Sequence, residues 1–575
     1  MQVSNTYQNK PPSDYQGQVI AISPSYYQVK LKDQVILLYS KVDLNFGDQI
    51  SFNGQYQNIK SVSNTFAYNF QKTMNNQAIF YQIKTDDVNI EASKSNYKSK
   101  LFNRINQIAN PEYYQKLILG INTFDSELKL SQIIISSGVM IQSLIRSLRK
   151  ILAIYFYDDN FDYYEIILYV ILALTYQKYA FYTFLALRII FRHLSLSRLD
   201  KFSLAAALTL FIFPTFGFSM AFIVVALFQF VYIIKREPRS FFVASLIMLP
   251  LSLRMNYEVS LLQIIIYPLI RTYYSFLFLI AYIDLILLTN FSYKIFTTFN
   301  LSFDYFKITG HLPLILLLAW IIISLRLLQA FKFYKVILLT TILIINQYQL
   351  IFSPSFIYHQ LYVGQGDATL LTYPFKVEVT LIDTGSPFNQ TKLQSALNYY
   401  GIKTIQNLII SHDDADHAGN LDYLNNNYTV KHIIREVGTY DFYQLKLNNY
   451  AYDSDDENDS SLITYFVVND IAYLLLGDIS KEVEVKFLQD NYDLDYHVLK
   501  LAHHGSNTST SNEILDNDSL KLLINSSGLN NMYNHPSPKV LERINHHGLL
   551  LVDTQDLGDI LIKHFARSTY LSIKR

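Results

Sequence analysis

Residues 411–420 read SHDDADHAGN, and this stretch places two histidines and three aspartates within six consecutive positions. The residues before it, NLII, are typical of a buried strand, so the cluster is expected at a strand end of an α/β domain. The side chains of His412, Asp414 and Asp416 share one side of an extended segment, and the following turn brings His417 round to them. Imidazole nitrogens and carboxylate oxygens at this spacing predict a site for one or two divalent ions.

Two later strand ends supply further donors. LLLGDIS ends a strand at Asp478, and VLKLAHHGS ends another at His503 and His504. The chain has no cysteine, so the ligands must be histidine and carboxylate, a set that suits Zn²⁺ or Mn²⁺. The predicted metal ligands are His412, Asp414, Asp416, His417, Asp478 and His503.

The chemistry expected of this site is hydrolysis of a phosphodiester bond, because a divalent ion polarises a phosphoryl oxygen and lowers the pKa of water. Asp478 is expected to be a shared ligand, and Asp416 a ligand that also orients water. For His504, hydrogen-bond or proton donation to the leaving oxygen and a structural role are both open. Ser506 is expected to contact phosphate. The predicted catalytic residues are therefore Asp416, Asp478 and His504.

Two motifs upstream of the cluster give further site candidates. VGQGDA places Asp367 in a glycine-rich turn between two strands, and LIDTG ends a hydrophobic strand at Asp383. Both aspartates are expected at the same edge of the sheet as the cluster, since strand ends gather there.

Length and composition describe what surrounds this domain. A chain of 575 residues predicts two to four domains. Half of the residues are hydrophobic and 16% are charged, with 47 basic and 47 acidic side chains, so global charge indicates no nucleic-acid or anionic-membrane partner. The first residues lack the basic start and apolar run of a signal peptide, so internal segments would have to direct membrane insertion.

The chain divides into four expected regions. A flexible N-terminus covers 1–15, and a small all-β domain covers 16–83, where short runs of Val, Ile and Tyr alternate with polar residues and turns. A helical integral-membrane region is expected over 84–352, with a helical connection beginning in its first residues. The α/β domain that holds the cluster is expected over 353–575.

Long apolar runs indicate membrane spans in the third region. Residues 202–234 carry no charge, and this run predicts one tilted or broken helix or two short passes. Further apolar runs raise the expected number of spans to about six to eight, against the alternative of a large soluble helical core. Arg188, Arg271, Asp284 and His311 lie in or beside these runs, where they would line a pore, form pairs or snorkel from helix ends.

These motifs, in this order, resemble the ComEC family of DNA-internalisation competence proteins. SHDDADHAGN, VGQGDA, LIDTG, LLLGDI, LAHHGS and NHPSPKVLERI resemble its C-terminal metallo-β-lactamase-type domain, an αββα sandwich. The apolar segments resemble its α-helical transmembrane competence region, and the early β block matches the position of its OB-like barrel. Ser137 and Gly138 stand where the family has SGLH, here SGVM. The channel or motif candidates are Ser137, Gly138, Arg188 and Asp284.

The resemblance implies a multi-pass protein of the cytoplasmic membrane that imports single-stranded DNA during natural transformation. It also implies an external nuclease domain that degrades the other strand, together with a separate DNA receptor and a cytoplasmic ATP-driven translocase. Two alternatives remain: a membrane-anchored metallo-hydrolase without a transport role, and a channel whose metal domain only binds DNA. The family's membrane segments ahead of the OB-like domain are not expected here, since the chain opens with β structure.

Overall fold

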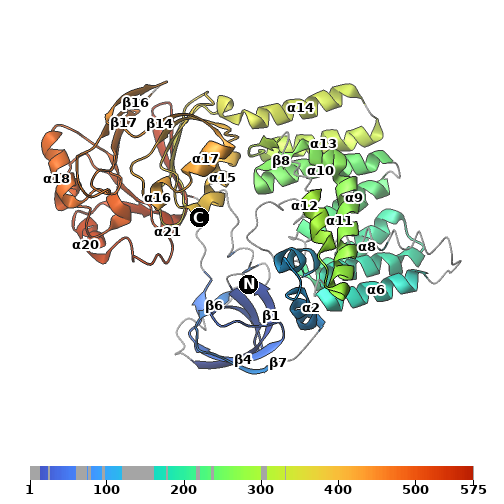
Figure 1. Ribbon diagram of the computed structural model, residues 1–575. Helices are drawn as coiled ribbons and strands as arrows, with labels where there is room; N and C mark the ends of the chain where they lie inside the picture. The colour runs from blue at the N-terminus through green and yellow to red at the C-terminus, as the bar shows by residue number, and fades with distance from the viewer. Residues whose placement is uncertain are drawn as a thin grey trace.

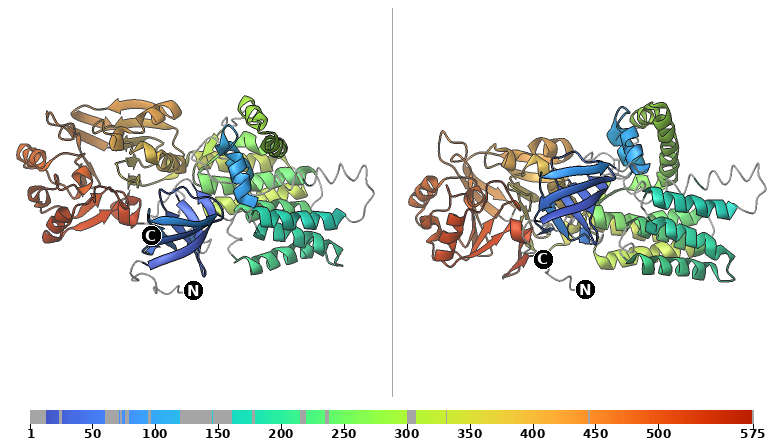
Figure 2. Two further views of the ribbon diagram at one scale, coloured as in Figure 1. Left: turned by 60° about the horizontal axis from the view of Figure 1, so that its bottom comes forward. Right: turned by 90° about the horizontal axis from the view of Figure 1, so that it is seen from below.

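The computed structural model describes residues 13–23, 26–59, 71, 74–75, 79–93, 97–119, 145, 161–176, 179–214, 220–234, 238–299, 307–330, 332–443 and 445–573. Figure 1 shows three parts in chain order: a small sheet, a group of helices, and a larger C-terminal part of sheets and helices. The C-terminal part and the helices lie on opposite sides, and both views of Figure 2 place the small sheet between them.

The N-terminal sheet forms from the alternating stretch that predicted β structure. Its strand order is β5-β6-β3-β2-β1-β4-β7, and the long strand β1 pairs antiparallel with both β2 and β4. Alternate side chains, among them Val19, Val29 and Ile50, fill one core because successive residues of a strand face opposite sides. The strands are β1 (Ser13–Ser23), β2 (Tyr26–Lys30), β3 (Val35–Tyr39), β4 (Asp48–Gly54), β5 (Gln57–Asn58), β6 (Tyr81–Lys84) and β7 (Val88–Ser93).

Strand β7 lies where the sequence predicted the start of a helical connection. It pairs antiparallel with β4 instead, with Val88 opposite Phe52. The short alternating run VNIEAS completes the edge of the sheet, so the helical connection begins only after it, with α2 (Tyr97–Ile105). The OB-like character of this sheet stays a prediction.

Helices dominate the middle of the chain, as the sequence predicted. They begin with α2 and α3 and continue, after a π-helical turn, into a group that packs side by side in Figure 1. The helices are α2 (Tyr97–Ile105), α3 (Pro111–Tyr114), α6 (Phe161–Tyr176), α7 (Tyr179–Ile190), α8 (Arg198–Ile212), α9 (Met220–Ile234), α10 (Pro238–Asn256), α11 (Leu261–Leu287), α12 (Phe291–Thr298), α13 (Leu314–Gln329) and α14 (Phe333–Gln347).

The predicted transmembrane bundle is wrong. Among the described residues, no helix combines the length and the apolar character needed to cross a membrane. The uncharged run 202–234 is shared between α8 and α9, which have 15 residues each, fewer than the roughly 20 that a bilayer requires.

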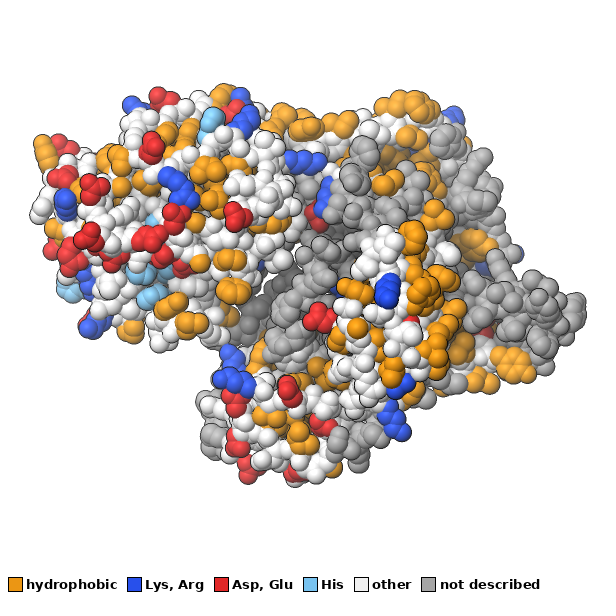
Figure 3. Space-filling model, in the orientation of Figure 1, with side chains coloured by type: hydrophobic (Ala, Val, Ile, Leu, Met, Phe, Trp, Pro, Cys, Tyr) orange, Lys and Arg blue, Asp and Glu red, His pale blue; other side chains and the backbone are white. Residues whose placement is uncertain are grey.

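The helices nevertheless expose many large apolar side chains. Phe211 is 84% exposed, Ile315 76% and Ile286 73%. Figure 3 shows apolar side chains over the helical part of this face, whereas acidic side chains gather on the C-terminal part. Exposed apolar surface of this kind is typical of a face that contacts another apolar surface.

The C-terminal part is a sandwich of two sheets, each seven-stranded within the described residues. The first has the order β14-β13-β12-β11-β10-β22-β23, and the second has the order β15-β16-β17-β18-β19-β20-β21. The first sheet contains β10 (Phe356–Gln360), β11 (Thr369–Thr372), β12 (Val379–Ile382), β13 (Thr404–Ile409), β14 (Thr429–Ile434), β22 (Ile560–Phe565) and β23 (Ser568–Ile573). The second contains β15 (Gly438–Phe442), β16 (Leu445–Tyr450), β17 (Ile463–Val468), β18 (Ile471–Leu475), β19 (Val498–Lys500), β20 (Leu522–Asn525) and β21 (Leu550–Asp553).

The two sheets face each other across one core, and helices cover their outer faces. Tyr358 of the first sheet stacks on Tyr473 of the second, with ring centroids 5.0 Å apart. The outer face of the first sheet packs on α15 (Gln390–Tyr399) and α17 (Leu421–Asn427), and that of the second on α18 (Lys481–Asp490), α19 (Asn512–Leu515) and α20 (Pro538–His546). The predicted αββα sandwich is confirmed. Its central strands are apolar on both faces because one face packs in the shared core and the other packs against the helices.

The helical part contacts the sandwich at α15. His311 stacks on Tyr399, with ring centroids 4.8 Å apart and ring planes at 21°. The side chain of Asn398 donates a hydrogen bond to Glu258, and that of Gln347 donates to the carbonyl of Gly401. His311, which the sequence placed in or beside an apolar run, therefore lies at the junction between two parts of the molecule.

Candidate metal centre

The predicted site segments meet at one edge of the sandwich. Strands β12 and β13 run parallel in one sheet, and β18 and β19 run parallel in the other. Each strand is followed by a candidate residue or cluster: Asp383 after β12, the SHDDADH stretch after β13, Asp478 after β18 and the histidine pair after β19. Parallel strands place their carboxyl ends at the same edge, so distant motifs become neighbours.

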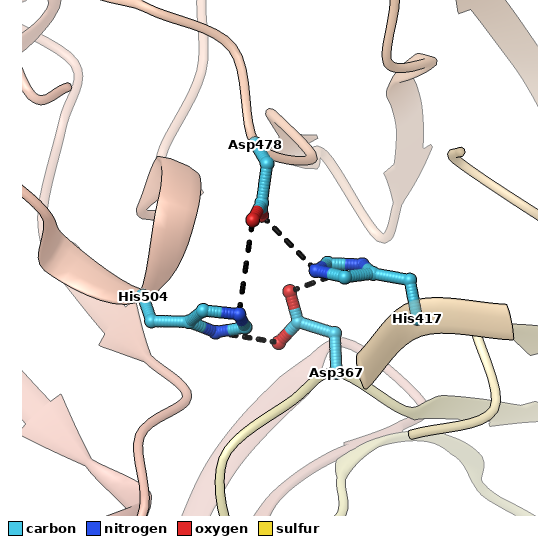
Figure 4. Close-up of side chains that lie close together, drawn as sticks. All are labelled: Asp367, His417, Asp478 and His504. Carbon is cyan, nitrogen blue, oxygen red and sulfur yellow. Dashed lines mark ion pairs between the residues drawn. The ribbon is translucent and has the colours of Figure 1, made fainter. Parts of the chain in front are cut away.

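The centre of the site is a buried group of two carboxylates and two imidazoles, formed by Asp367, His417, Asp478 and His504. One possible ligand atom from each residue lies within 4.8 Å of the others. His417 Nε2 is 3.2 Å from Asp478 Oδ1, and His504 Nε2 is 3.8 Å from Asp478 Oδ2. Figure 4 shows the four side chains pointing toward one another from separate segments.

Charge pairing decides the protonation of this group. Burial raises the pKa of Asp478, but the His417 and His504 imidazoles hold that pKa well below its usual range. Burial lowers the pKa of His417, yet Asp478 and Asp383 raise that pKa well above the usual value. The carboxylates therefore favour positive charge at the centre, which imidazolium protons or a divalent cation can supply.

A second layer of hydrogen bonds orients the imidazoles. Asp383 accepts hydrogen bonds from His417 Nδ1 at 2.9 Å and from the Ser411 hydroxyl at 2.9 Å. Ser411 Oγ lies 3.0 Å from His412 Nδ1, and its own hydrogen is directed to Asp383, so it can accept from His412. His504 Nδ1 donates to the carbonyl of Ser526 at 2.8 Å. In His412 and His417 Nε2 is therefore the nitrogen left for the centre, whereas His504 Nε2 faces Asp416.

The residues fit a divalent metal ion. Within the described part of the chain, four buried atoms here have no hydrogen-bond partner: Asp367 Oδ1, His412 Nε2, His417 Nε2 and Asp478 Oδ1. Buried polar atoms normally have hydrogen-bond partners, so four such atoms without a hydrogen bond in one place are unusual. Two nitrogens and two oxygens without sulfur match Zn²⁺ or Mn²⁺.

His412 is buried beside His417, whereas Asp414 and Asp416 lie at the rim. The His412 ring is 4.2 Å from the His417 ring, and its Nε2 is 3.6 Å from Asp414 Oδ2. The Asp414 side chain is 48% exposed and precedes α16 (Ala415–Ala418). Asp416, with a side chain 32% exposed, accepts a hydrogen bond from His504 Nε2 at 3.1 Å. Burial raises the pKa of Asp416, but the hydrogen bond and charge of His504 lower it to about 2.

A left-handed turn presents the histidine pair. His503 and His504 have φ angles of 48° and 55°, and Gly505 follows with 80°. Consecutive non-glycine residues in this region are strained, a feature that clusters at functional sites. The turn buries His504 and leaves His503 partly exposed, with its Nε2 3.9 Å from Asp478 Oδ2. Ser506 is buried, and its hydroxyl pairs with that of Thr508 at 2.9 Å.

Of the channel candidates, the structure describes Arg188 and Asp284, and both lie in helices of the middle part of the chain. Ser137 and Gly138 fall outside the described residues, and Arg188 lies in α7. Asp284 is buried, accepts the backbone N–H groups of Phe291 and Ser292 at 3.0 and 2.8 Å, and accepts the Tyr114 hydroxyl. These bonds serve the first turn of α12, so they give Asp284 a structural function.

Two residues of the site were not predicted from the sequence. Lys500 is buried and forms an ion pair with Asp367. His535 lies beside His503, with ring centroids 6.1 Å apart, and burial together with His504 and His503 lowers the pKa of His535 to about 4. The sequence did hold a signal for Lys500: it is a lysine inside the apolar run VLKLA, and a buried lysine requires a partner.

Residues 361–524 match the family described as the metallo-beta-lactamase superfamily, which agrees with the sandwich and its strand-end site. The chain is also 29% identical over 258 residues to "ComE operon protein 3" of Bacillus subtilis, covering 37% of this chain and 33% of that protein. It is 30% identical to "Competence protein ComA" of Neisseria gonorrhoeae (31% and 28% covered) and 28% identical to "Recombination protein 2" of Haemophilus influenzae (41% and 32%).

The resemblance to ComEC-type competence proteins is therefore confirmed. The matches span about a third of the length of these curated relatives.

Proposed function

We propose that this protein acts in DNA uptake and that its C-terminal sandwich is a metal-dependent phosphodiesterase that cleaves DNA. The convergence at the strand-end edge of buried nitrogen and oxygen atoms that have no hydrogen bond carries the hydrolase part of this proposal. The names of the curated relatives support the uptake part. Degradation of one strand while the other is imported is the specific form of the activity that we propose.

The residues of the site divide into proposed metal ligands and residues that orient those ligands. Asp367, His417 and Asp478 would hold the metal, with His412 beside them, and Asp383 fixes the His417 ring. Asp414 and His503 at the rim are candidates for a second ion. When bound, the metal would polarise the phosphoryl oxygen and make water acidic enough to react near neutral pH.

Asp416 is proposed to orient the attacking water at the mouth of the site. A carboxyl group with a pKa near 2 is a weak base, so a role in holding water in line suits it better than proton abstraction. His504, which bonds Asp416 through Nε2, fixes the carboxylate in place. We also propose that His504 stabilises charge on the phosphate oxygens in the transition state.

The wider setting stays a proposal that rests on the resemblance. It includes a separate DNA receptor, an ATP-driven translocase and a location at the cytoplasmic membrane.

The test is cleavage of single-stranded and double-stranded DNA by the full chain with added Mn²⁺ or Zn²⁺. We expect cleavage that requires metal and falls by at least about 100-fold in Asp416→Ala and His412→Ala. Asp455→Ala, a change in an exposed acidic loop, is the matched control and should retain activity. Metal-loaded, folded protein that leaves both DNA forms intact would overturn the nuclease proposal.

A further inference from the structure

A loop that the mechanism does not use lies against the metal centre. Residues 528–537 read GLNNMYNHPS and connect β20 with α20. A Cβ on Gly505 would come within 2.7 Å of Pro536, and one on Gly528 within 2.8 Å of the backbone nitrogen of Gln365. The loop therefore packs on both the histidine turn and the glycine-rich loop that carries Asp367.

Aromatic rings lead outward from the centre through this loop. His504 and His503 have ring centroids 6.3 Å apart, and His503 and His535 are 6.1 Å apart. His535 then stacks on Tyr533 at 5.7 Å, with ring planes only 14° apart. Tyr533 is 62% exposed, so one end of the series is buried among the ligands and the other faces solvent.

The backbone around Tyr533 is held in place by Asn531. The Asn531 amide nitrogen donates to the carbonyls of Gly528 and His535 at 2.9 and 2.7 Å, and its oxygen accepts the His535 N–H at 2.9 Å. A ring that is exposed yet mounted on a fixed loop loses little conformational entropy when something stacks on it. This arrangement distinguishes Tyr533 from an ordinary exposed tyrosine, which needs no explanation.

We propose that Tyr533, backed by His535, is a stacking platform for an unpaired nucleobase, so that the metal centre receives single-stranded nucleic acid. This inference rests on the proposed phosphodiesterase function. A base of an unpaired strand offers a free π-face, whereas within a duplex both faces are covered by neighbouring bases. Stacking is independent of base identity, which suits an enzyme that must accept any sequence.

The experiment measures binding of a fluorescent oligothymidylate by the full chain, with chelator present so that cleavage does not consume the strand. A strand of equal length with abasic residues keeps the phosphates and removes the rings. We expect Tyr533→Ala to weaken oligothymidylate binding roughly 5- to 100-fold and abasic-strand binding little, since one base stack is lost. Tyr533→Phe, which keeps the ring, should bind like the unchanged protein.

The control is Tyr492→Ala, at a tyrosine that is 83% exposed in the turn after α18. Unchanged oligothymidylate binding in Tyr533→Ala would overturn the proposal, as would equal losses for both strands. Hydrolysis of bis(p-nitrophenyl) phosphate by the unchanged protein separates the two ideas, because this ester has no nucleobase. If it is hydrolysed with metal while Tyr533→Ala binds normally, only the platform fails; if it is never hydrolysed, the phosphodiesterase proposal fails.

Discussion

At the scale of single residues, the centre is a balance of buried charges. Lys500 and Asp367 are each 3% exposed and form an ion pair. Burial lowers the pKa of Lys500, but Asp367 and Asp478 raise that pKa above its usual value, so the lysine stays charged. The pair fixes one oxygen of Asp367 and leaves Oδ1, the atom without a partner, facing the centre.

Replacing the lysine tests this balance. Lys500→Met removes the cation nearest to the buried Asp367 carboxylate, so the free energy of unfolding of the sandwich should fall by about 3–5 kcal/mol. The double variant Lys500→Met with Asp367→Asn removes both charges and should recover part of that loss. Denaturant unfolding in the presence of chelator measures both. Equal destabilisation in the single and double variants would show that the lysine acts through packing alone.

At the scale of elements, a glycine-rich loop and a short helix form one side of the centre. The backbone N–H of Asp367 donates to the carbonyl of Asp416 at 3.0 Å, which ties the β10–β11 loop to α16. Gly366 has φ +127°, and a Cβ there would lie 2.4 Å from the same carbonyl oxygen. The GQGD sequence is therefore required for the close approach of two backbones, as well as for delivering Asp367.

Gly366→Ala should force the loop away from α16 and reduce metal affinity at least roughly 10-fold, as changes to supporting contacts of metal ligands do. Gly548→Ala is the matched control, because Gly548 also has a left-handed φ (+63°) but a Cβ there would meet nothing within 4 Å. Calorimetric titration with Mn²⁺ or Zn²⁺ compares the two. Equal affinities would mean that the loop adjusts without moving Asp367.

At the scale of the whole molecule, the site depends on two sheets held at a fixed distance. His564 of the first sheet is 2% exposed, and its Nε2 lies 2.6 Å from the hydroxyl of Tyr473 in the second sheet. Its Nδ1 lies 2.9 Å from the Thr569 hydroxyl. Burial lowers the pKa of His564 to about 4, so the folded protein holds this ring neutral.

This histidine links stability to pH. Its folded pKa, near 4, lies below the roughly 6.5 of an unfolded histidine, so the unfolded state binds the proton first. The stability that the neutral His564 ring gives to the folded protein is complete above about pH 6.5, and it is lost as the pH falls toward 4. The destabilisation caused by His564→Gln should therefore shrink by roughly 1–2 kcal/mol between pH 7.5 and pH 5. Thermal unfolding of the unchanged protein and of His564→Gln at several pH values measures this effect. A stability difference between the two that is constant with pH would show that protonation of His564 is not linked to folding.

By itself, the sequence was enough to predict most of the candidate site residues and the strand ends at which they lie. The SHDDADH stretch, Asp478 and the histidine pair each follow an apolar strand, and local periodicity and turn residues are enough to show that. The absence of cysteine restricted the donors to nitrogen and oxygen. The αββα sandwich was predicted through the family resemblance that these motifs carry.

Only the tertiary structure decided which of these side chains meet. Lys500 and Asp367 are 133 positions apart, and no local pattern records such a pair. The same holds for His535 beside His503, and for Asp383 behind His417. Hydropathy likewise predicted membrane spans in 202–234. The length of each helix depends on where it begins and ends, and the structure divides this run between two helices of 15 residues. The physical reason is the same in each case: periodicity is a property of neighbours in sequence, whereas pairing and helix limits depend on packing across the fold.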